Sequence, residues 1–251
     1  MLFRENEHGT LAISQLTHAW ISGQILAAWA DELDRALLLA AEQHDIGWLD
    51  WEAHPTFDPA TGRPHLFRNI GAAIHAPMWA AGVERALGAW GTRVALLISR
   101  HGGVIYQRFT DRHRLAEADA LAAKHYLSTQ ATIEARWAHA LGLDADALER
   151  DTALIAFADT LSLVLCGELK APLELEVPTP GHGMQTLRVA ALAGQENCFT
   201  LSPWPFRART LIVEGEARRL PDGPFEDEAA MRVWLACAER VLFTAKLTPI
   251  D

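Results

Sequence analysis

Apolar residues recur at helical spacing from about residue 14 to residue 166, and this pattern constrains the fold more than any other feature of the chain. The same stretch is rich in Ala, Leu, Glu, Arg and Gln, which favour helices. We therefore expect helices at roughly 14–29, 31–46, 76–89, 92–102, 112–140 and 145–166. Residues 50–69 contain Pro59, Gly62 and Pro64, and they predict a long irregular loop.

The pattern changes after Gly167. Residues 173–177 alternate apolar and charged side chains, and further strand-like runs occur at 187–189, 198–201 and 208–220. Helical spacing returns from Phe225 to Lys246. The expected fold class is mainly α, with a helical domain over residues 1–167. A small antiparallel sheet and a final helix follow over residues 168–251 and pack on the first domain.

Composition narrows the class of partner. A hydrophobic content of 50% over 251 residues supports a sizeable core. The formal net charge of -10 disfavours a nucleic-acid polymer or an anionic membrane as partner, which leaves a small-molecule substrate. The first ten residues lack the apolar stretch of a secretory signal, and the apolar run at 153–166 is too short to span a bilayer. We therefore expect a cytoplasmic protein.

Imidazole and carboxylate groups recur at positions where helical segments are otherwise apolar. Such groups are hard to accommodate there unless they bind something. Asp159 is the clearest case, because Ile155 and Leu163 share its helical face. A buried carboxylate needs a cation or a full set of hydrogen-bond donors. The candidate metal ligands are His18, His44, Asp45, His75, His101 and Asp159.

Two of these positions have distinctive settings. Asp45 has two carboxylate oxygens and can bridge two ions roughly 3.5–4 Å apart, which an imidazole cannot do. His75 is followed by Ala76 and Pro77, and we expect it just outside a helix start or at a kink. Six ligands of these types suffice for a two-metal centre.

The order His, His-Asp, His, His, Asp over a series of helices resembles the HD-domain superfamily of metal-dependent phosphohydrolases, across roughly residues 10–167. The His-Asp-x-Gly-Trp pattern at 44–48 and the string at 159–163 resemble an uncharacterised bacterial branch of HD-like proteins. The resemblance implies an HD-like helical bundle. It also implies a first metal on His18, His44, Asp45 and Asp159, and a second on Asp45, His75 and His101.

The resemblance implies a phosphohydrolase in which water activated by two divalent ions attacks a small phosphorylated metabolite or nucleotide. Mixed imidazole and carboxylate ligands suit iron, manganese, zinc or nickel. Two alternatives stay open at this point. One is an HD-type mixed-valent di-iron oxygenase of a small polyol or phosphonate, and the other is a non-catalytic, metal-containing nucleotide sensor.

Residues near the six positions complete the prediction. Besides Asp45, the candidate catalytic groups are Glu52 and His54, either of which could supply a general acid. The candidate substrate contacts are two guanidinium groups that suit phosphate and two aromatic side chains: Arg68, Arg100, Tyr106 and Trp48. The C-terminal sheet could serve as a lid, a homodimer surface or a brace.

Overall fold

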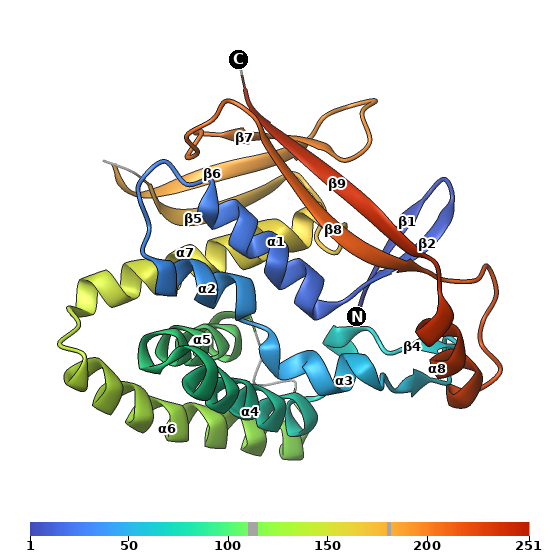
Figure 1. The fold of residues 1–251 in the computed structure, drawn as a ribbon, viewed down its shortest axis with the longest axis horizontal. Coiled ribbons are helices and arrows are strands. Elements are labelled where there is room, and N and C mark those ends of the chain that lie inside the picture. The colour runs from blue at the N-terminus through green and yellow to red at the C-terminus, as the bar shows by residue number, and fades with distance from the viewer. Residues whose placement is uncertain (110–114, 180–181, 251) are drawn as a thin grey trace.

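A seven-stranded mixed sheet lies over a group of helices in the computed structural model of the chain, which describes residues 1–109, 115–179 and 182–250 (Figure 1). The strand order is β1-β2-β8-β9-β7-β6-β5. Neighbouring strands are antiparallel except β7 and β9, which are parallel. The strands are β1 (Leu2–Asn6), β2 (Gly9–Ile13), β5 (Leu173–Thr179), β6 (Gly183–Ala191), β7 (Cys198–Ser202), β8 (Leu211–Arg219) and β9 (Arg240–Pro249).

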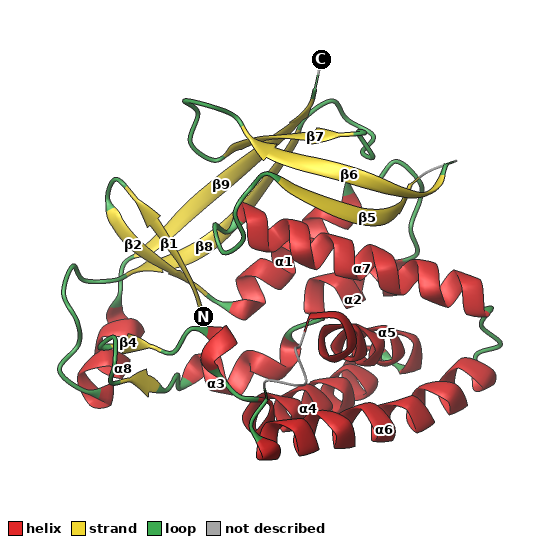
Figure 2. Cartoon of the chain, turned by 180° about the vertical axis from the view of Figure 1, so that it is seen from behind, coloured by secondary structure: helices red, strands yellow, loops and turns green. Residues whose placement is uncertain are grey.

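Helices α1 and α7 lie directly against one face of the sheet, and the remaining helices of the first 140 residues pack beneath them (Figures 1 and 2). The main hydrophobic core joins these helices to the inward side chains of β5, β6, β8 and β9. The helices are α1 (Gln15–Ala27), α2 (Arg35–Gln43), α3 (Leu49–Ala53), α4 (Ala72–Trp90), α5 (Thr92–Val104), α6 (Glu117–Ala140), α7 (Ala145–Leu165) and α8 (Glu228–Cys237).

Local signals in the sequence fix where three of the site-bearing helices begin. The side chains of Ser14, Asp34 and Asp144 each accept a hydrogen bond from the backbone N–H three residues further on, at the starts of α1, α2 and α7. Such caps satisfy N–H groups that have no partner within the helix. They set the helical register that points the later residues of α1 and α7 inward.

The predicted fold class, a mainly α bundle with a small C-terminal antiparallel sheet, is wrong. The sheet has seven strands, is mixed, and takes two strands from the first 13 residues of the chain. Strand β2 pairs with β8, so the sheet crosses the boundary expected at residue 167. The prediction failed because pairing between segments some 200 residues apart leaves no local signal, and because β1 and β2 are only five residues long.

The predicted final helix over residues 225–246 is also wrong in its second half. Helix α8 ends at Cys237, and the chain continues as strand β9 (Arg240–Pro249). Phe243, Ala245 and Leu247 are buried at every second position, which is the period of a strand with one covered face. Short apolar runs fit helical and strand spacing equally well, and here pairing with β8 decides between them.

The loop expected at residues 50–69 contains regular structure. It holds α3, the two short paired strands β3 (Phe57–Asp58) and β4 (Arg63–Pro64), and a 3-10 turn η2 (Phe67–Asn69).

His75 lies inside α4 rather than outside a helix start, because α4 begins at Ala72 and continues through Pro77. A proline there removes one hydrogen bond to the preceding turn, and the helix nevertheless continues to Trp90. The helix predicted at 112–140 begins at Glu117, and residues 112–114 lie outside the described part of the chain.

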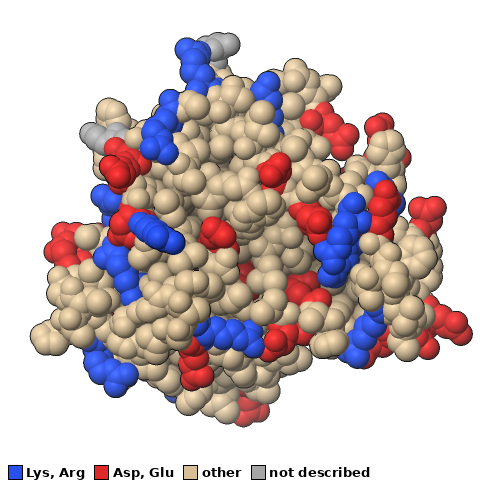
Figure 3. All heavy atoms as spheres, viewed as in Figure 1, with Lys and Arg blue, Asp and Glu red and all other residues tan. Residues whose placement is uncertain are grey.

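No helix within the described residues is long and apolar enough to cross a membrane. On the face shown in Figure 3, acidic and basic side chains are interspersed and do not separate into large patches of one sign.

Candidate metal centre

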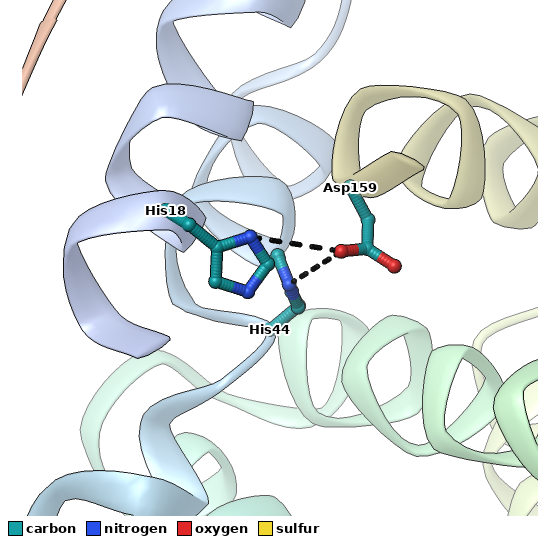
Figure 4. A group of neighbouring side chains, drawn as sticks. All are labelled: His18, His44 and Asp159. Atoms are coloured by element: carbon teal, nitrogen blue, oxygen red, sulfur yellow. Dashed lines mark ion pairs between the residues drawn. The ribbon is translucent and has the colours of Figure 1, made fainter. Parts of the chain in front are cut away.

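Five of the six predicted ligand residues meet between α1, α2, α5 and α7. His18 comes from α1, His44 is the C-terminal cap of α2 with Asp45 beside it, His101 comes from α5 and Asp159 from α7. All five are buried, with between 1% and 5% of their surface exposed. In Figure 4 the side chains of His18, His44 and Asp159 point toward one another. The predicted burial of Asp159 is confirmed.

The spacing of these atoms suits a single metal ion. Nε2 of His44 lies 3.6 Å from Oδ1 of Asp159 and 3.8 Å from Oδ2 of Asp45. The same Asp45 oxygen lies 2.8 Å from Nε2 of His18. Ligand atoms bound at about 2.0–2.2 Å to one ion lie at most about 4 Å apart. His18, His44 and Asp159 each offer a ligand atom within 4.8 Å of the others, so a small adjustment would bring all of them to one ion.

Hydrogen bonds fix which nitrogen of His44 faces the group. Its Nδ1 lies 2.8 Å from the carbonyl oxygen of Ala41 and donates to it. The lone pair of the neutral ring is therefore on Nε2, which is buried and has no hydrogen-bond partner among the described residues. Metal-binding histidines are oriented in this way by a carbonyl on the opposite ring nitrogen. A buried nitrogen left without a partner calls for an explanation, and a bound cation supplies one.

His18 is oriented by Ser162, a residue that sequence analysis did not assign to the site. The hydroxyl of Ser162 donates to the carbonyl oxygen of Asp159 at 2.7 Å, so it accepts from Nδ1 of His18 at 2.8 Å. This leaves Nε2 of His18 facing Asp45. The available signal was a serine one turn after a buried aspartate. Nothing in the sequence showed that α1 would place a histidine against it.

The charges of this group depend on one another. Burial lowers the pKa of His44, but the carboxylates of Asp45 and Asp159 raise it further, to about 9. Burial alone would raise the pKa of Asp159, yet the nearby rings of His44, His101 and His18 hold it well below its usual range. The pocket therefore favours a positive charge between its carboxylates, as either a proton or a metal ion.

His101 completes the group from the side of α5. Its Nε2 lies 3.6 Å from Oδ2 of Asp159, and its ring centre is 4.6 Å from that of His44. Burial, together with the charge of His44, lowers the pKa of His101 to about 4, so the ring is neutral at neutral pH. Its Nδ1 is also buried without a partner in the described part of the chain. A neutral imidazole in this position is a fifth group with a lone pair near Asp159.

His75 lies apart from these five residues. Its Nδ1 is 2.7 Å from the hydroxyl oxygen of Tyr106, and its ring packs against Trp48 and Trp79. Within the described ranges it forms no ion pair with a carboxylate. The structure thus gathers ligands for one ion, and the second metal on Asp45, His75 and His101 stays a prediction.

A cavity of about 630 Å³ opens beside Asp159. This volume lies within the range of about 300–1,000 Å³ found for small-molecule sites. Asp159, Trp48, His75 and Arg68 all line it, so the candidate metal centre, two predicted substrate contacts and His75 share one space. The remaining wall is largely apolar and includes Phe67, Ile70, Trp79, Ile105, Leu163 and Leu169.

Comparison with known proteins gives a family. A family described as a protein of unknown function, DUF3891, matches residues 1–222. The chain belongs to the DUF3891 family. The match includes all five clustered residues and Ser162, but it carries no assigned activity. No curated protein and no solved structure matches the chain.

The other predicted catalytic residues of this DUF3891 chain lie elsewhere. Glu52 is buried, accepts a hydrogen bond from the backbone N–H of Gln15 at 2.9 Å, and lies 3.4 Å from the amino nitrogen of Met1. These contacts hold the start of α1. His54 is exposed at the end of α3 and is not among the residues that line the cavity. The structure therefore brings neither residue to the clustered ligands.

The predicted substrate contacts divide into two groups. Trp48 and Arg68 line the cavity, although the guanidinium of Arg68 is paired with the carboxylate of Glu168. Arg100 is not a lining residue and binds Thr152 at 2.9 Å and Glu149 at 2.8 Å on α7. Tyr106 is fully buried behind His75 and reaches the cavity only through its hydrogen bond to that ring.

A close backbone approach positions the His44–Asp45 turn. This turn runs into the 3-10 helix η1 (Ile46–Trp48), which packs on α4. A Cβ added to Gly82 of α4 would lie 2.8 Å from the backbone nitrogen of Gly47, whereas a Cβ on Gly88 in the same helix would meet nothing within 4 Å. Only glycine allows α4 to approach the turn this closely.

We therefore expect Gly82→Ala and Gly88→Ala to change stability in opposite directions. Overpacking against the turn should lower the free energy of unfolding of Gly82→Ala by about 1–3 kcal/mol. Gly88→Ala should raise it by up to about 1 kcal/mol, because alanine favours an open helical position. Urea denaturation measures both. Equal effects of the two substitutions would contradict the close contact.

Proposed function

We propose that the chain is a metal-dependent phosphohydrolase that acts on a small phosphorylated molecule, with a divalent ion held by His18, His44, Asp45 and Asp159. The observation that carries this proposal is the buried Nε2 of His44, which has no hydrogen-bond partner among the described residues and two carboxylates within 4 Å, and which offers a lone pair when the ring is neutral. The resemblance of the same positions to the HD-domain superfamily supports it.

The donor set fits such an ion. Two carboxylates and two imidazoles match the ligand preferences of iron, manganese, zinc and nickel. No lysine or arginine of the described residues pairs with Asp45 or Asp159, so the positive charge between the two carboxylates comes from a histidine proton or a bound ion. His101 lies close enough to Asp159 to serve as a further ligand or to contact a bound substrate.

A divalent ion at this position supplies a Lewis acid that polarises a phosphoryl oxygen and makes water more acidic. The chain supplies everything else. Ala41 and Ser162 hold His44 and His18 in the orientation that directs Nε2 of each ring toward the carboxylates. Burial of all five groups excludes bulk water, and the adjoining cavity gives a substrate direct access to Asp159. Electrostatic interactions are stronger in such a protected site than in bulk water.

Metal analysis combined with a substrate screen tests this proposal. Protein purified without chelators should retain close to one equivalent of a transition metal. Metal-free protein resupplied with manganese, iron, zinc or nickel should release phosphate from at least one member of a panel of phosphomonoesters and nucleotides, and a chelator should abolish that release. The control is Asp50→Ala, because Asp50 is exposed and close in sequence to Asp45.

The screen should follow oxygen consumption in parallel. Oxygen uptake without phosphate release, together with two irons per chain, would contradict the hydrolase and favour the di-iron oxygenase. Retention of no metal would contradict both enzymes. A stoichiometry of two metals with phosphate release would keep the hydrolase and restore the predicted second metal.

A further inference from the structure

The cavity beside Asp159 has a wall suited to an uncharged ring. Trp48 and Trp79 contribute their indole rings, and Leu163 contributes an aliphatic side chain one turn of α7 beyond Asp159. Burial of an apolar ligand against such a surface is favourable because it removes apolar area from water. Flat rings pack well against indoles. The shape and chemistry of the wall therefore favour a ligand whose body is planar or apolar.

His75 is a polar group within this wall, as are Asn69, Asp119 and Thr160, and Tyr106 fixes the orientation of the His75 ring. The Tyr106 hydroxyl lies 2.7 Å from Nδ1 of His75, and it has no other hydrogen-bond partner among the described residues. Because this hydroxyl is fully buried, its proton needs an acceptor, and Nδ1 is the one available. Tyr106 therefore donates to His75. The two rings also stack, with centres 5.4 Å apart and planes 16° from parallel.

Because Nδ1 of His75 accepts from Tyr106, the ring can donate a hydrogen bond only from its other nitrogen, Nε2. Burial lowers the pKa of His75 to about 4, so the ring carries a single proton at neutral pH. Since Nδ1 accepts from Tyr106, that proton is on Nε2. No described residue accepts a hydrogen bond from Nε2, and His75 lines the cavity. A ligand oxygen would supply the acceptor that the described residues do not provide.

Arg68 also lines the cavity, but its guanidinium is not free to donate a hydrogen bond to a ligand. Its guanidinium is paired with the Glu168 carboxylate and also donates to the Glu168 carbonyl oxygen at 3.0 Å. The side chain of Glu168 is 7% exposed, so separating this pair would leave a largely buried charge without its partner. His75 is therefore an uncommitted donor on this wall, next to the indole N–H groups of Trp48 and Trp79, which are buried and have no hydrogen-bond partner among the described residues.

We propose that the cavity binds an alcohol with a planar or apolar body, or the phosphate monoester of that alcohol, and that His75 donates a hydrogen bond from Nε2 to the alcohol oxygen. The ester part of this inference rests on the proposed function. When that ester is hydrolysed, the bond between phosphorus and the alcohol oxygen breaks and a bond from a water oxygen to phosphorus forms. A proton from that water ends on the alcohol oxygen, which is the atom that His75 contacts.

The alcohol alone tests the cavity without metal or turnover. We would titrate 2-naphthol into metal-free protein in the presence of a chelator and follow fluorescence, with 2-methylnaphthalene as a ligand of the same shape that lacks the hydroxyl. His75→Phe should weaken 2-naphthol about three- to tenfold, the loss expected for one hydrogen bond, and leave 2-methylnaphthalene unchanged. Tyr106→Phe should give a smaller change in the same direction, because the ring could then carry its proton on either nitrogen.

A second pair of variants tests the wall. Leu163→Arg should abolish 2-naphthol binding, whereas Leu121→Arg on α6, where the leucine is 67% exposed, should not change it. Thermal unfolding of both variants would verify that they fold. Absence of 2-naphthol binding to the unmodified chain, or an equal effect of His75→Phe on both ligands, would overturn the inference.

Turnover separates this inference from the proposed function. With manganese supplied, phosphate release from 2-naphthyl phosphate should be at least tenfold faster, as kcat/KM, than from methyl phosphate. Binding of 2-naphthol without phosphate release from either ester would overturn the phosphohydrolase and with it the ester, while leaving the alcohol site in place. Equal rates on the two esters, with no 2-naphthol binding, would overturn the alcohol site and leave the hydrolase.

Discussion

Asp45→Ala should remove the metal and lower the turnover of the proposed hydrolase by at least about a hundredfold, while the protein remains folded. Asp45 lies close to both His18 and His44, so its loss removes the ligand that contacts two of the others. Loss of an outer-shell partner alone costs about 10–100-fold in metal affinity or activity, and loss of a direct ligand should cost at least as much. Metal content after dialysis and the rate of phosphate release measure the two effects.

Asp50→Ala is the matched control for this experiment. It makes the same substitution five residues away, at a carboxylate that is 78% exposed and paired with Arg85 on the surface. Exposed pairs of this kind contribute about 0–1 kcal/mol, so its metal content and rate should match those of the unmodified chain. If Asp45→Ala retained its metal and full rate on an identified substrate, the proposed centre would be wrong.

The clustered ligands were predictable from the sequence because each is a titratable residue in or beside an otherwise apolar helical segment. Asp159 shares a helical face with Ile155 and Leu163, and that setting demands a partner wherever the helix packs. His18, His44 and His101 were weaker signals that gained weight from their order along the chain. Ser162 could not be assigned, because its role depends on how α1 packs on α7.

His75 shows where this reasoning reaches its limit. A histidine near a proline in an apolar segment was predicted to bind a second metal. In the structure Tyr106 occupies its Nδ1, and the ring faces the cavity between indoles. The order of residues along the chain predicted His75 as a ligand, and in the structure it lines the cavity beside Asp159. Whether it binds a metal or donates to a substrate depends on its hydrogen-bond partner, which lies 31 residues away in the chain.

The sheet was less predictable than the helices for a physical reason. Helical periodicity depends on residues three and four apart, and most of the site-bearing helices were placed to within a few residues. Pairing of β2 with β8 depends on residues about 200 positions apart. The run at 208–220 predicted a strand, but nothing near it in the sequence indicated β2 as its partner. The sheet also affects the position of a ligand, because α1, which carries His18, packs against both β8 and α7.

Asp159→Ala should abolish the dependence of protein stability on metal. An ion that binds only the folded state stabilises it by about 4 kcal/mol when its concentration is a thousand times its dissociation constant. For a chain of this size that corresponds to roughly 8–16 °C in the midpoint of thermal unfolding. The unmodified protein should therefore lose about this much when a chelator replaces manganese, whereas Asp159→Ala should unfold at nearly the same temperature in both.

Asp146→Ala provides the comparison on the same helix. Asp146 is exposed in the first turn of α7, several turns before Asp159. It should keep the full response to manganese and lose at most about 1 kcal/mol from its interaction with the helix dipole. A response of Asp159→Ala to manganese as large as that of Asp146→Ala would mean that the ion binds elsewhere. An unmodified chain that unfolds at one temperature with and without metal would mean instead that the buried carboxylates are satisfied by the proton on His44, and that the group of five residues is a structural element of the core.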